Sequence, residues 1–399
     1  MSTVIAAPLT PRLPSATQKG SLPLHVLTLT PFYPSAQDRA QGCFIAEPLP
    51  HLRLLRIETH VLAVNPFYRA AQSPSGDQSE WTKYYCLPGN AGLVTSGVLL
   101  AKSVRPRILA LHGASPISLI HAHAALPCGE AAMLLAKQLN IPFAVSVHGL
   151  DIFAERQAGR WLGPWTKRSS MHVYRQADAI VCVSDKVRQL LPEDLQAKSR
   201  IVYNGVDSSV FTPRREPGGS PRILSVGNLI PTKDHALLLR AFARTLHIVP
   251  ESQLEIIGEG PERSRLTALA SSMGISNRVN FRGRQDRSTV AAAMQSCSIF
   301  ALPSRYEGLG CVYLEAMACG KPAIGCLGQG IDEIIRHGEN GLLINPGDEA
   351  GLSNALLGLL RDGALRARLG HAAREKVVRT HTLQHQAAAL AEIYRERAR

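Results

Sequence analysis

Two glutamates eight residues apart, Glu307 and Glu315, bound the stretch of this sequence with the richest chemistry. A short loop with two glycines follows Glu307, and the next residues are rich in Leu, Glu, Ala and Met, which favour a helix. The first N–H groups of a helix have no partner inside it and attract anions, so the backbone of Gly308, Leu309, Gly310 and Cys311 can bind a diphosphate. A carboxylate further along, Glu315, can accept the paired hydroxyls of a ribose. The combination is suited to holding a sugar nucleotide.

The spacing of the two glutamates bears on whether they act as a pair. If most of the stretch between them is helical, a rise of about 1.5 Å per residue separates the carboxylates by roughly 12 Å. The acid and base of a glycosidase lie about 5 to 9.5 Å apart, so hydrolysis by this pair is not expected. We expect Glu307 and Glu315 to have separate roles.

Further candidate residues follow predicted strands. Lys233 comes after the strand expected at 222–226, and its ammonium can hold a phosphate through a charge-assisted hydrogen bond. His123 ends the strand expected at 119–123, and His148 follows the one expected at 143–147. Ligands collect at such strand ends in open α/β sheets, although a lone histidine is often only a packed or an exposed one. Both interpretations of each histidine stay open at this point.

The stretch Pro303–Pro322 resembles the E-x7-E signature of the retaining glycosyltransferases of family 4, and the resemblance extends from about Thr30 to Asp348. It implies the fold of that family, in which two Rossmann-like α/β domains face each other across a cleft. It also implies that Glu315 binds the ribose, that the amides of residues 308–311 meet the diphosphate, and that Glu307 lies beside the donor sugar.

The same resemblance extends to the donor diphosphate and its cations. It implies that Lys233 contacts the diphosphate and that the loop of Gly42 approaches it from the first domain, where a side chain would obstruct the backbone. Asn228 stands where the family often has Arg, so an amide replaces one of two usual phosphate cations. Arg305 is a further candidate to neutralise the leaving diphosphate.

On the acceptor side, the resemblance implies that His123 lies close to the reacting sugar and that His148 and Asp151 line the acceptor. It also implies retention at the anomeric carbon. Tyr203–Asp207 resembles the turn that joins the two domains, but the same residues are equally typical of a plain hairpin.

Length and composition predict a two-domain globular protein. The chain has 399 residues, 45% of them hydrophobic, and a formal net charge of +13, which favours anionic partners. Its eight cysteines include no C-x-x-C pair, which favours reduced thiols and a cytoplasmic location. No apolar run reaches the roughly 18 residues of a membrane-spanning helix, and the N-terminus does not resemble a secretory signal.

Short apolar runs alternate with helix-like segments, which predicts a parallel α/β sheet in each half. We expect a flexible tail at 1–22, an acceptor-side domain at 23–212, a linker at 213–220 and a donor domain at 221–378. A charged helix at 379–399 is expected to return to the first domain. The strands are expected at 24–30, 59–64, 119–123, 143–147, 179–183, 222–226, 253–257, 279–281, 299–302 and 322–325.

No Asp-x-Asp pair and no cluster with metal-ligand spacing occurs in the sequence, so we expect catalysis without a metal or any other cofactor. Residues Phe153 to Arg175 combine Trp161 and Trp165 with several Arg and Lys residues. Such a segment can rest on an anionic membrane surface, and a solvated helix with a packed aromatic face is an equal alternative.

The sequence therefore predicts a transferase that moves a sugar from a nucleoside diphosphate sugar to a glycan or a lipid-linked acceptor. Bacterial surface polysaccharide synthesis is the expected pathway, in the cytoplasm or at the inner face of the plasma membrane. A sugar-nucleotide epimerase or hydrolase on the same scaffold is one alternative. A non-catalytic protein that binds anions or nucleic acid is another, but no nucleic-acid-binding motif supports it.

Overall fold

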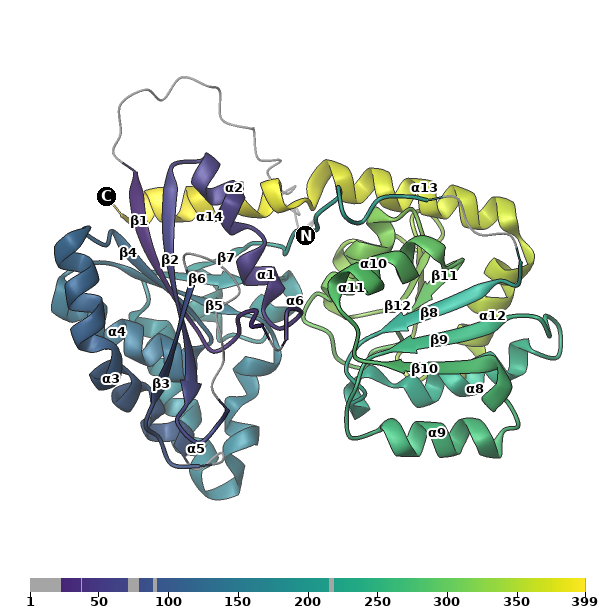
Figure 1. Cartoon of the computed structure of the whole chain (residues 1–399), viewed down its shortest axis with the longest axis horizontal. Coiled ribbons are helices and arrows are strands. Elements are labelled where there is room, and N and C mark those ends of the chain that lie inside the picture. Colours follow the sequence, from purple (N-terminus) through teal and green to yellow (C-terminus); the bar gives the residue numbers. More distant parts are fainter. Residues whose placement is uncertain (1–22, 37, 71–78, 89–91, 215–218, 399) are drawn as a thin grey trace, which may run out of the picture.

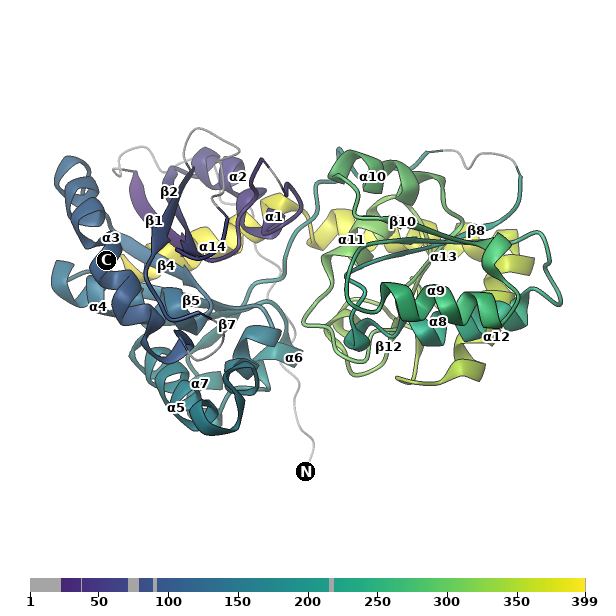
Figure 2. The same cartoon turned by 60° about the horizontal axis from the view of Figure 1, so that its bottom comes forward.

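The computed structural model describes residues 23–36, 38–70, 79–88, 92–214 and 219–398. The expected tail at 1–22 and the middle of the expected linker, 215–218, lie outside the described residues. The described chain forms two parallel sheets side by side, each with helices on both faces (Figures 1 and 2). This confirms the predicted class of two Rossmann-like α/β domains.

The first sheet has seven parallel strands in the order β3-β2-β1-β4-β5-β6-β7. Its strands are β1 (Leu24–Thr30), β2 (Ile57–Pro66), β3 (Ser79–Tyr84), β4 (Leu119–His123), β5 (Phe143–Val147), β6 (Ala179–Cys182) and β7 (Ser199–Ile201). Its helices are α1 (Cys43–Ala46), α2 (Leu49–Leu54), α3 (Leu93–Ala114), α4 (Glu130–Leu139), α5 (Ala154–Gln176), α6 (Asp185–Arg188) and α7 (Glu193–Gln196).

The second sheet has six parallel strands in the order β10-β9-β8-β11-β12-β13. Helices α8 and α9 lie on one face, and α10 and α11 lie on the other (Figure 2). The strands are β8 (Arg222–Val226), β9 (Gln253–Ile257), β10 (Val279–Gly283), β11 (Ile299–Ala301), β12 (Ala323–Cys326) and β13 (Leu342–Ile344). The helices are α8 (His235–Thr245), α9 (Arg263–Ser272), α10 (Arg287–Ser296), α11 (Cys311–Ala318) and α12 (Glu349–Arg361).

The ten expected strands all occur, with ends that differ by at most a few residues, but β3, β7 and β13 were not predicted. Strand β3 is polar along most of its length and only its two end residues are buried. Strands β7 and β13 have three residues each, too few to show a pattern of alternation. The three strands that the sequence did not reveal all lie at sheet edges and are polar or only three residues long.

The C-terminal segment differs in detail from the single helix expected there. Helix α13 (Gly363–Thr380) ends in the second domain, and α14 (Leu383–Arg397) begins after a break at His381 and Thr382. Leu390 and Tyr394 of α14 pack with Val26 of β1 on the sheet face opposite α3, α4 and α5. The expected return of the C-terminal helix to the first domain is confirmed (Figure 1).

The chain crosses between the domains twice, and the two crossings touch. Val206 of the segment Tyr203–Asp207 forms a parallel bridge with Thr382, and its N–H donates to the carbonyl of His381 at 3.0 Å. A Cβ on Gly205 would lie 2.4 Å from the Thr382 carbonyl oxygen, so only glycine fits there. In the described residues, no helix has both the length and the apolar character needed to cross a membrane.

Candidate functional site

The loop between Glu307 and α11 ends in an uncapped helix start. Gly310 precedes α11 with a φ of 82°, a left-handed conformation that favours glycine, and no side chain caps the helix. Among the hydrogen bonds of the described residues, none uses the backbone N–H of Leu309, Gly310 or Cys311. These amides are therefore available to an anion, as expected.

Only the second half of the glutamate stretch is helical. Helix α11 begins at Cys311, so residues 308–310 are loop and the condition behind the 12 Å separation is not met. Glu315 lies one turn into the helix and is 3% exposed. The separate surroundings of the two carboxylates, described next, are the better ground for separate roles.

Glu307 forms an ion pair with Lys233, which ends the short helical turn after β8. The side chains of Lys233 and Glu307 are 17% and 13% exposed, so the pair is largely shielded from water. The Glu307 N–H donates to Gln329 Oε1 at 3.1 Å, which holds the loop. Two residues that the sequence placed near the donor are thus in direct contact.

Two further residues expected at the donor site, Asn228 and Arg305, are exposed. Asn228, in the loop after β8, is exposed. Arg305 is 60% exposed, and its Nε lies 2.6 Å from Asp234 Oδ2. Asp234 also accepts from the Leu237 N–H at the start of α8. The residue that caps α8 therefore also holds the Arg305 guanidinium.

Gly42 precedes α1 with a φ of 67°. A Cβ at this position would lie 2.5 Å from the carbonyl carbon of Phe32, so the turn itself excludes a side chain. Helix α1 ends at Ala46 and α2 starts at Leu49, directly after Pro48.

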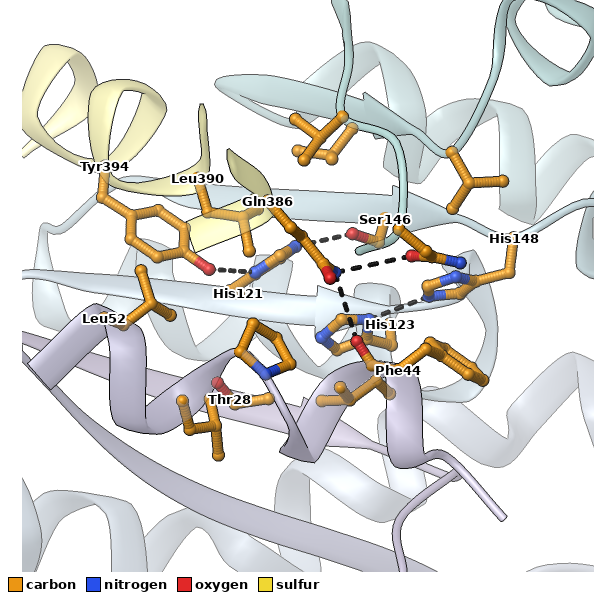
Figure 3. Close-up of a pocket in the computed structure, with 17 residues that line it drawn as sticks. Thr28, Phe44, Leu52, His121, His123, Ser146, His148, Gln386, Leu390 and Tyr394 are labelled. Carbon is orange, nitrogen blue, oxygen red and sulfur yellow. Dashed lines mark hydrogen bonds between the residues drawn. The ribbon is translucent and has the colours of Figure 1, made fainter. Parts of the chain in front are cut away.

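Three histidines lie against one another near the ends of β4 and β5 (Figure 3). His123 Nδ1 and His148 Nε2 lie 2.9 Å apart, and the His121 and His123 ring centroids are 4.6 Å apart. Burial lowers the pKa of His121 to about 3 and that of His148 to about 4, and burial also lowers the pKa of His123. All three rings are neutral at pH 7, so the site offers them as hydrogen-bonding groups and not as cations.

Helix α14 contributes two side chains, those of Tyr394 and Gln386, to the surroundings of this cluster. The Tyr394 hydroxyl lies 2.6 Å from His121 Nδ1, and His121 Nε2 lies 2.8 Å from Ser146 Oγ (Figure 3). Gln386 Nε2 donates to the carbonyl of Phe44 at 3.2 Å. These groups line a cavity of about 30 Å³, which is room for about one or two water molecules.

Asp151 holds the backbone turn after β5. Its carboxylate accepts from the N–H of His148 at 3.0 Å and from that of Gly149 at 2.7 Å. Burial raises the pKa of Asp151 to about 6, whereas these amide bonds lower it. The geometry assigns this carboxylate to positioning His148, and the expected direct contact of Asp151 with an acceptor stays a prediction.

The acceptor-side and donor-side residues meet because the two domains touch. Ser184 Oγ donates to the Gly308 carbonyl oxygen at 2.5 Å. A Cβ on Gly308 would lie 2.5 Å from the carbonyl oxygen of His148, so glycine allows the loops of the two domains to approach. Glu333 of the second domain accepts from the backbone N–H groups of Asp185 and Lys186 at 2.8 and 2.7 Å.

Several residues at this interface were not predicted. Arg287 of α10 donates to Glu315 Oε1 at 2.7 Å and to Glu47 Oε2 at 2.8 Å. Arg287, Glu47, Gln386 and Tyr394 belong to no motif, and their partners are distant in sequence, so no local signal could have identified them. Within the described residues, no group of three or more His, Cys, Asp or Glu side chains is placed to hold a metal ion.

Comparisons with known proteins show the family of this chain. Residues 209–376 match the family described as glycosyl transferases group 1, and residues 47–210 match the family described as glycosyltransferase family 4. An uncharacterized glycosyltransferase of Methanocaldococcus jannaschii is 31% identical over 261 residues, which cover 65% of this chain and 70% of that protein.

Two solved structures show the same fold. A sucrose-phosphate synthase from Thermosynechococcus elongatus superposes with a TM-score of 0.78 at 20% identity, over 94% of this chain and 98% of that one. Anabaena HepE, solved in complex with UDP and glucose, superposes with a TM-score of 0.72 at 18% identity, over 94% of this chain and all of the other.

Proposed function

We propose, since this chain belongs to the group 1 glycosyltransferases of family 4 and has their GT-B fold, that it transfers a sugar from a nucleoside diphosphate sugar to a hydroxyl of a glycan or a lipid-linked acceptor. The reaction retains the anomeric configuration and needs no metal. The observation that carries the proposal is the uncapped start of α11 beside Lys233, Glu307 and the buried Glu315.

Each part of that site has a task in the transfer. The free amides at the start of α11 and the Lys233 ammonium neutralise the diphosphate as it leaves, in a place already shielded from water. Glu315 accepts the ribose hydroxyls, and Glu307 lies where it can bind hydroxyls of the donor sugar. An acceptor hydroxyl then attacks the anomeric carbon from the side of the leaving diphosphate. The bond from that carbon to the diphosphate oxygen breaks, and the hydroxyl proton passes to the diphosphate.

The neutral histidines face the transferred sugar from the first domain. His148 Nδ1 is buried and has no hydrogen-bond partner among the described residues, so it can form a hydrogen bond with a sugar hydroxyl. His123 is held by His148 and is the group proposed to contact the reacting sugar. Because both rings are uncharged, they orient hydroxyls without competing with Lys233 for the diphosphate.

A panel of UDP-, GDP- and ADP-sugars tests the proposal. The true donor should raise the melting temperature in proportion to the logarithm of its concentration. Release of the nucleoside diphosphate should then depend on an added acceptor. Release without any acceptor would identify a hydrolase instead, and the absence of stabilisation by every nucleotide would favour a non-catalytic protein.

We further propose that the basic segment Phe153 to Arg175 rests on an anionic membrane surface and so brings the cleft to a lipid-linked acceptor of surface polysaccharide synthesis. Trp161 and Trp165 of α5 are 88% and 59% exposed, so the packed aromatic face of the alternative interpretation is absent at these two positions. Lys167 and Arg168 are exposed beside them, and the Arg168 guanidinium lies 5.7 Å from the centre of the Trp165 ring.

Pelleting with vesicles tests the proposed binding to an anionic membrane surface. The parent should pellet with vesicles that contain phosphatidylglycerol and stay in the supernatant with neutral phosphatidylcholine vesicles. Changing both tryptophans to Ala should abolish pelleting and leave the melting temperature unchanged. No binding by the parent would remove this proposal and leave the transferase proposal intact.

A further inference from the structure

Arg287 lies between two carboxylates that come from different domains. Its Nη1 donates to Glu315 Oε1 at 2.7 Å and its Nη2 donates to Glu47 Oε2 at 2.8 Å. Glu315 belongs to α11 of the donor domain, and Glu47 directly follows α1, the helix that begins at the glycine loop. One guanidinium therefore joins the proposed ribose carboxylate to the loop on the opposite side of the cleft.

The guanidinium is held in a single orientation. Its carbon lies 4.9 Å from the centre of the Phe211 ring, which is fully buried in the segment that crosses between the domains. The side chain of Arg287 is 23% exposed, and those of Glu47 and Glu315 are 21% and 4% exposed. Charges this sheltered are stable only when paired, so removal of one member leaves the others strongly unfavourable.

The pairing leaves room for a ribose. An ionised carboxylate has about four acceptor positions on two oxygens. Arg287 occupies Glu315 Oε1, and no hydrogen bond of the described residues uses Oε2. Arg287 and the ribose hydroxyls can therefore share the carboxylate, one on each oxygen.

We propose that Arg287 is a positioning residue of the donor site, which orients Glu315 toward the ribose and, through Glu47, ties the glycine loop to the bound nucleotide. The donor site is then complete only while the domains touch. This inference rests on the proposed function for the role of Glu315, but the link between the domains does not depend on it.

The electrostatics of the cluster agree with this role. Without Arg287, one buried and one partly buried carboxylate would face each other across the cleft and repel. Burial raises the pKa of Glu47, Arg287 lowers it and Glu315 raises it, which places all three groups within mutual influence. A lysine cannot replace the planar fork that reaches both carboxylates at once.

Three variants separate the two halves of the inference. Arg287→Gln removes the positioning and the link, Glu47→Ala removes only the link, and Arg287→Lys keeps the charge but loses the fork. Arg282→Gln is the matched control, because its guanidinium donates to Glu255 at 2.9 Å inside the donor domain. Circular dichroism and melting curves confirm that each variant folds.

Small-angle X-ray scattering without ligand tests the link between the domains. The radius of gyration should increase in Arg287→Gln, Glu47→Ala and Arg287→Lys, and it should equal that of the parent in Arg282→Gln. An unchanged radius of gyration in both Glu47→Ala and Arg287→Gln would overturn the link.

Calorimetric titration with UDP, GDP and ADP tests whether Arg287 positions Glu315. A hydrogen bond to a charged group is worth about 1.5–3 kcal/mol, so Arg287→Gln should weaken binding of the preferred nucleotide by roughly 10- to 150-fold. Glu47→Ala should bind it nearly as the parent does, but turn over the donor at least about tenfold more slowly. Equal nucleotide affinity in Arg287→Gln and the parent would overturn the positioning role. If the parent binds none of the three nucleotides, the proposed function fails together with that role, and scattering still decides the link.

Discussion

The ammonium of Lys233 and the carboxylate of Glu307 are paired with each other inside the donor domain. One is expected to hold the donor diphosphate and the other the donor sugar, so the two binding groups neutralise each other before the donor arrives. An ammonium has three N–H donors, so Lys233 can bind a phosphate oxygen and keep Glu307 as a second partner. Substitutions of the two residues should therefore have opposite effects on nucleotide binding.

Replacing Lys233 with Ala should weaken binding of the nucleoside diphosphate. The lost charge-assisted hydrogen bond is worth about 1.5–3 kcal/mol, which corresponds to roughly a 10- to 150-fold rise in Kd. Titration calorimetry with the preferred nucleotide measures it. An unchanged Kd in a folded variant would remove Lys233 from the diphosphate site.

Replacing Glu307 with Gln should have the opposite effect on the nucleotide alone. The substitution frees Lys233 from its anionic partner, so the nucleoside diphosphate should bind at least as tightly as it does to the parent. Turnover should fall by about a hundredfold or more if Glu307 stabilises the donor sugar in the transition state. Steady-state kinetics beside the same titration would show this split, and a variant with normal turnover would contradict the role of Glu307.

Replacing Tyr394 with Phe should slow turnover from the far end of the chain. When Tyr394 donates to His121 Nδ1 and Nε2–H donates to Ser146, both ring nitrogens of His121 have a partner, and the His121 ring in turn packs against His123. Loss of the hydroxyl should lower kcat about five- to tenfold and leave the donor KM unchanged.

Leu390→Ala is the control for the Tyr394 variant. Leu390 lines the same cavity from α14 but makes no hydrogen bond to a histidine through its apolar side chain. Its truncation should cost about 2–5 kcal/mol of stability and leave kcat of the folded protein near the parent value. If both variants lose kcat in proportion to their lost stability, the effect of Tyr394 is only structural.

Acidification should destabilise the protein through its buried histidines. The pKa values of His121 and His148 are lowered to about 3 and about 4, below the ordinary value of 6.5, because burial disfavours the charged ring. Stability is therefore complete above pH 6.5 and is lost as the pH falls toward 4, by about 1.4 kcal/mol per histidine and pH unit. Melting temperatures at pH 7, 6 and 5 should fall steadily in the parent and less steeply in His121→Gln. A melting temperature that rises on acidification would contradict the neutral cluster.

Replacing Gly42 with Ala should cost more than the backbone conformation alone explains. Gly42 and Gly328 share a φ of 67°, but a Cβ on Gly42 would meet the carbonyl carbon of Phe32 at 2.5 Å, whereas a Cβ on Gly328 would meet nothing within 4 Å. Gly328→Ala should therefore cost about 1–2 kcal/mol, and Gly42→Ala distinctly more. Thermal melting of the two variants compares them, and equal losses would show that the Phe32 contact relaxes.

The sequence by itself determined the two parallel sheets and supplied the candidate residues of the donor site. Strands such as Leu119–His123 and Phe143–Val147 are buried along their whole length, so their apolar runs are continuous and their ends are visible in the chain. The glycines and carboxylates near α11 are local in sequence, because a helix start is built from neighbouring residues.

Only the tertiary structure decided what these groups touch. Arg287 meets Glu47 across 240 residues, and Tyr394 meets His121 across 273. The partner of a buried charge depends on which helices and loops the sheets bring together, and neither composition nor periodicity contains that information. The structure thereby replaced a set of candidate residues with specific pairs: Lys233 with Glu307, Arg287 with Glu315, and His123 with His148.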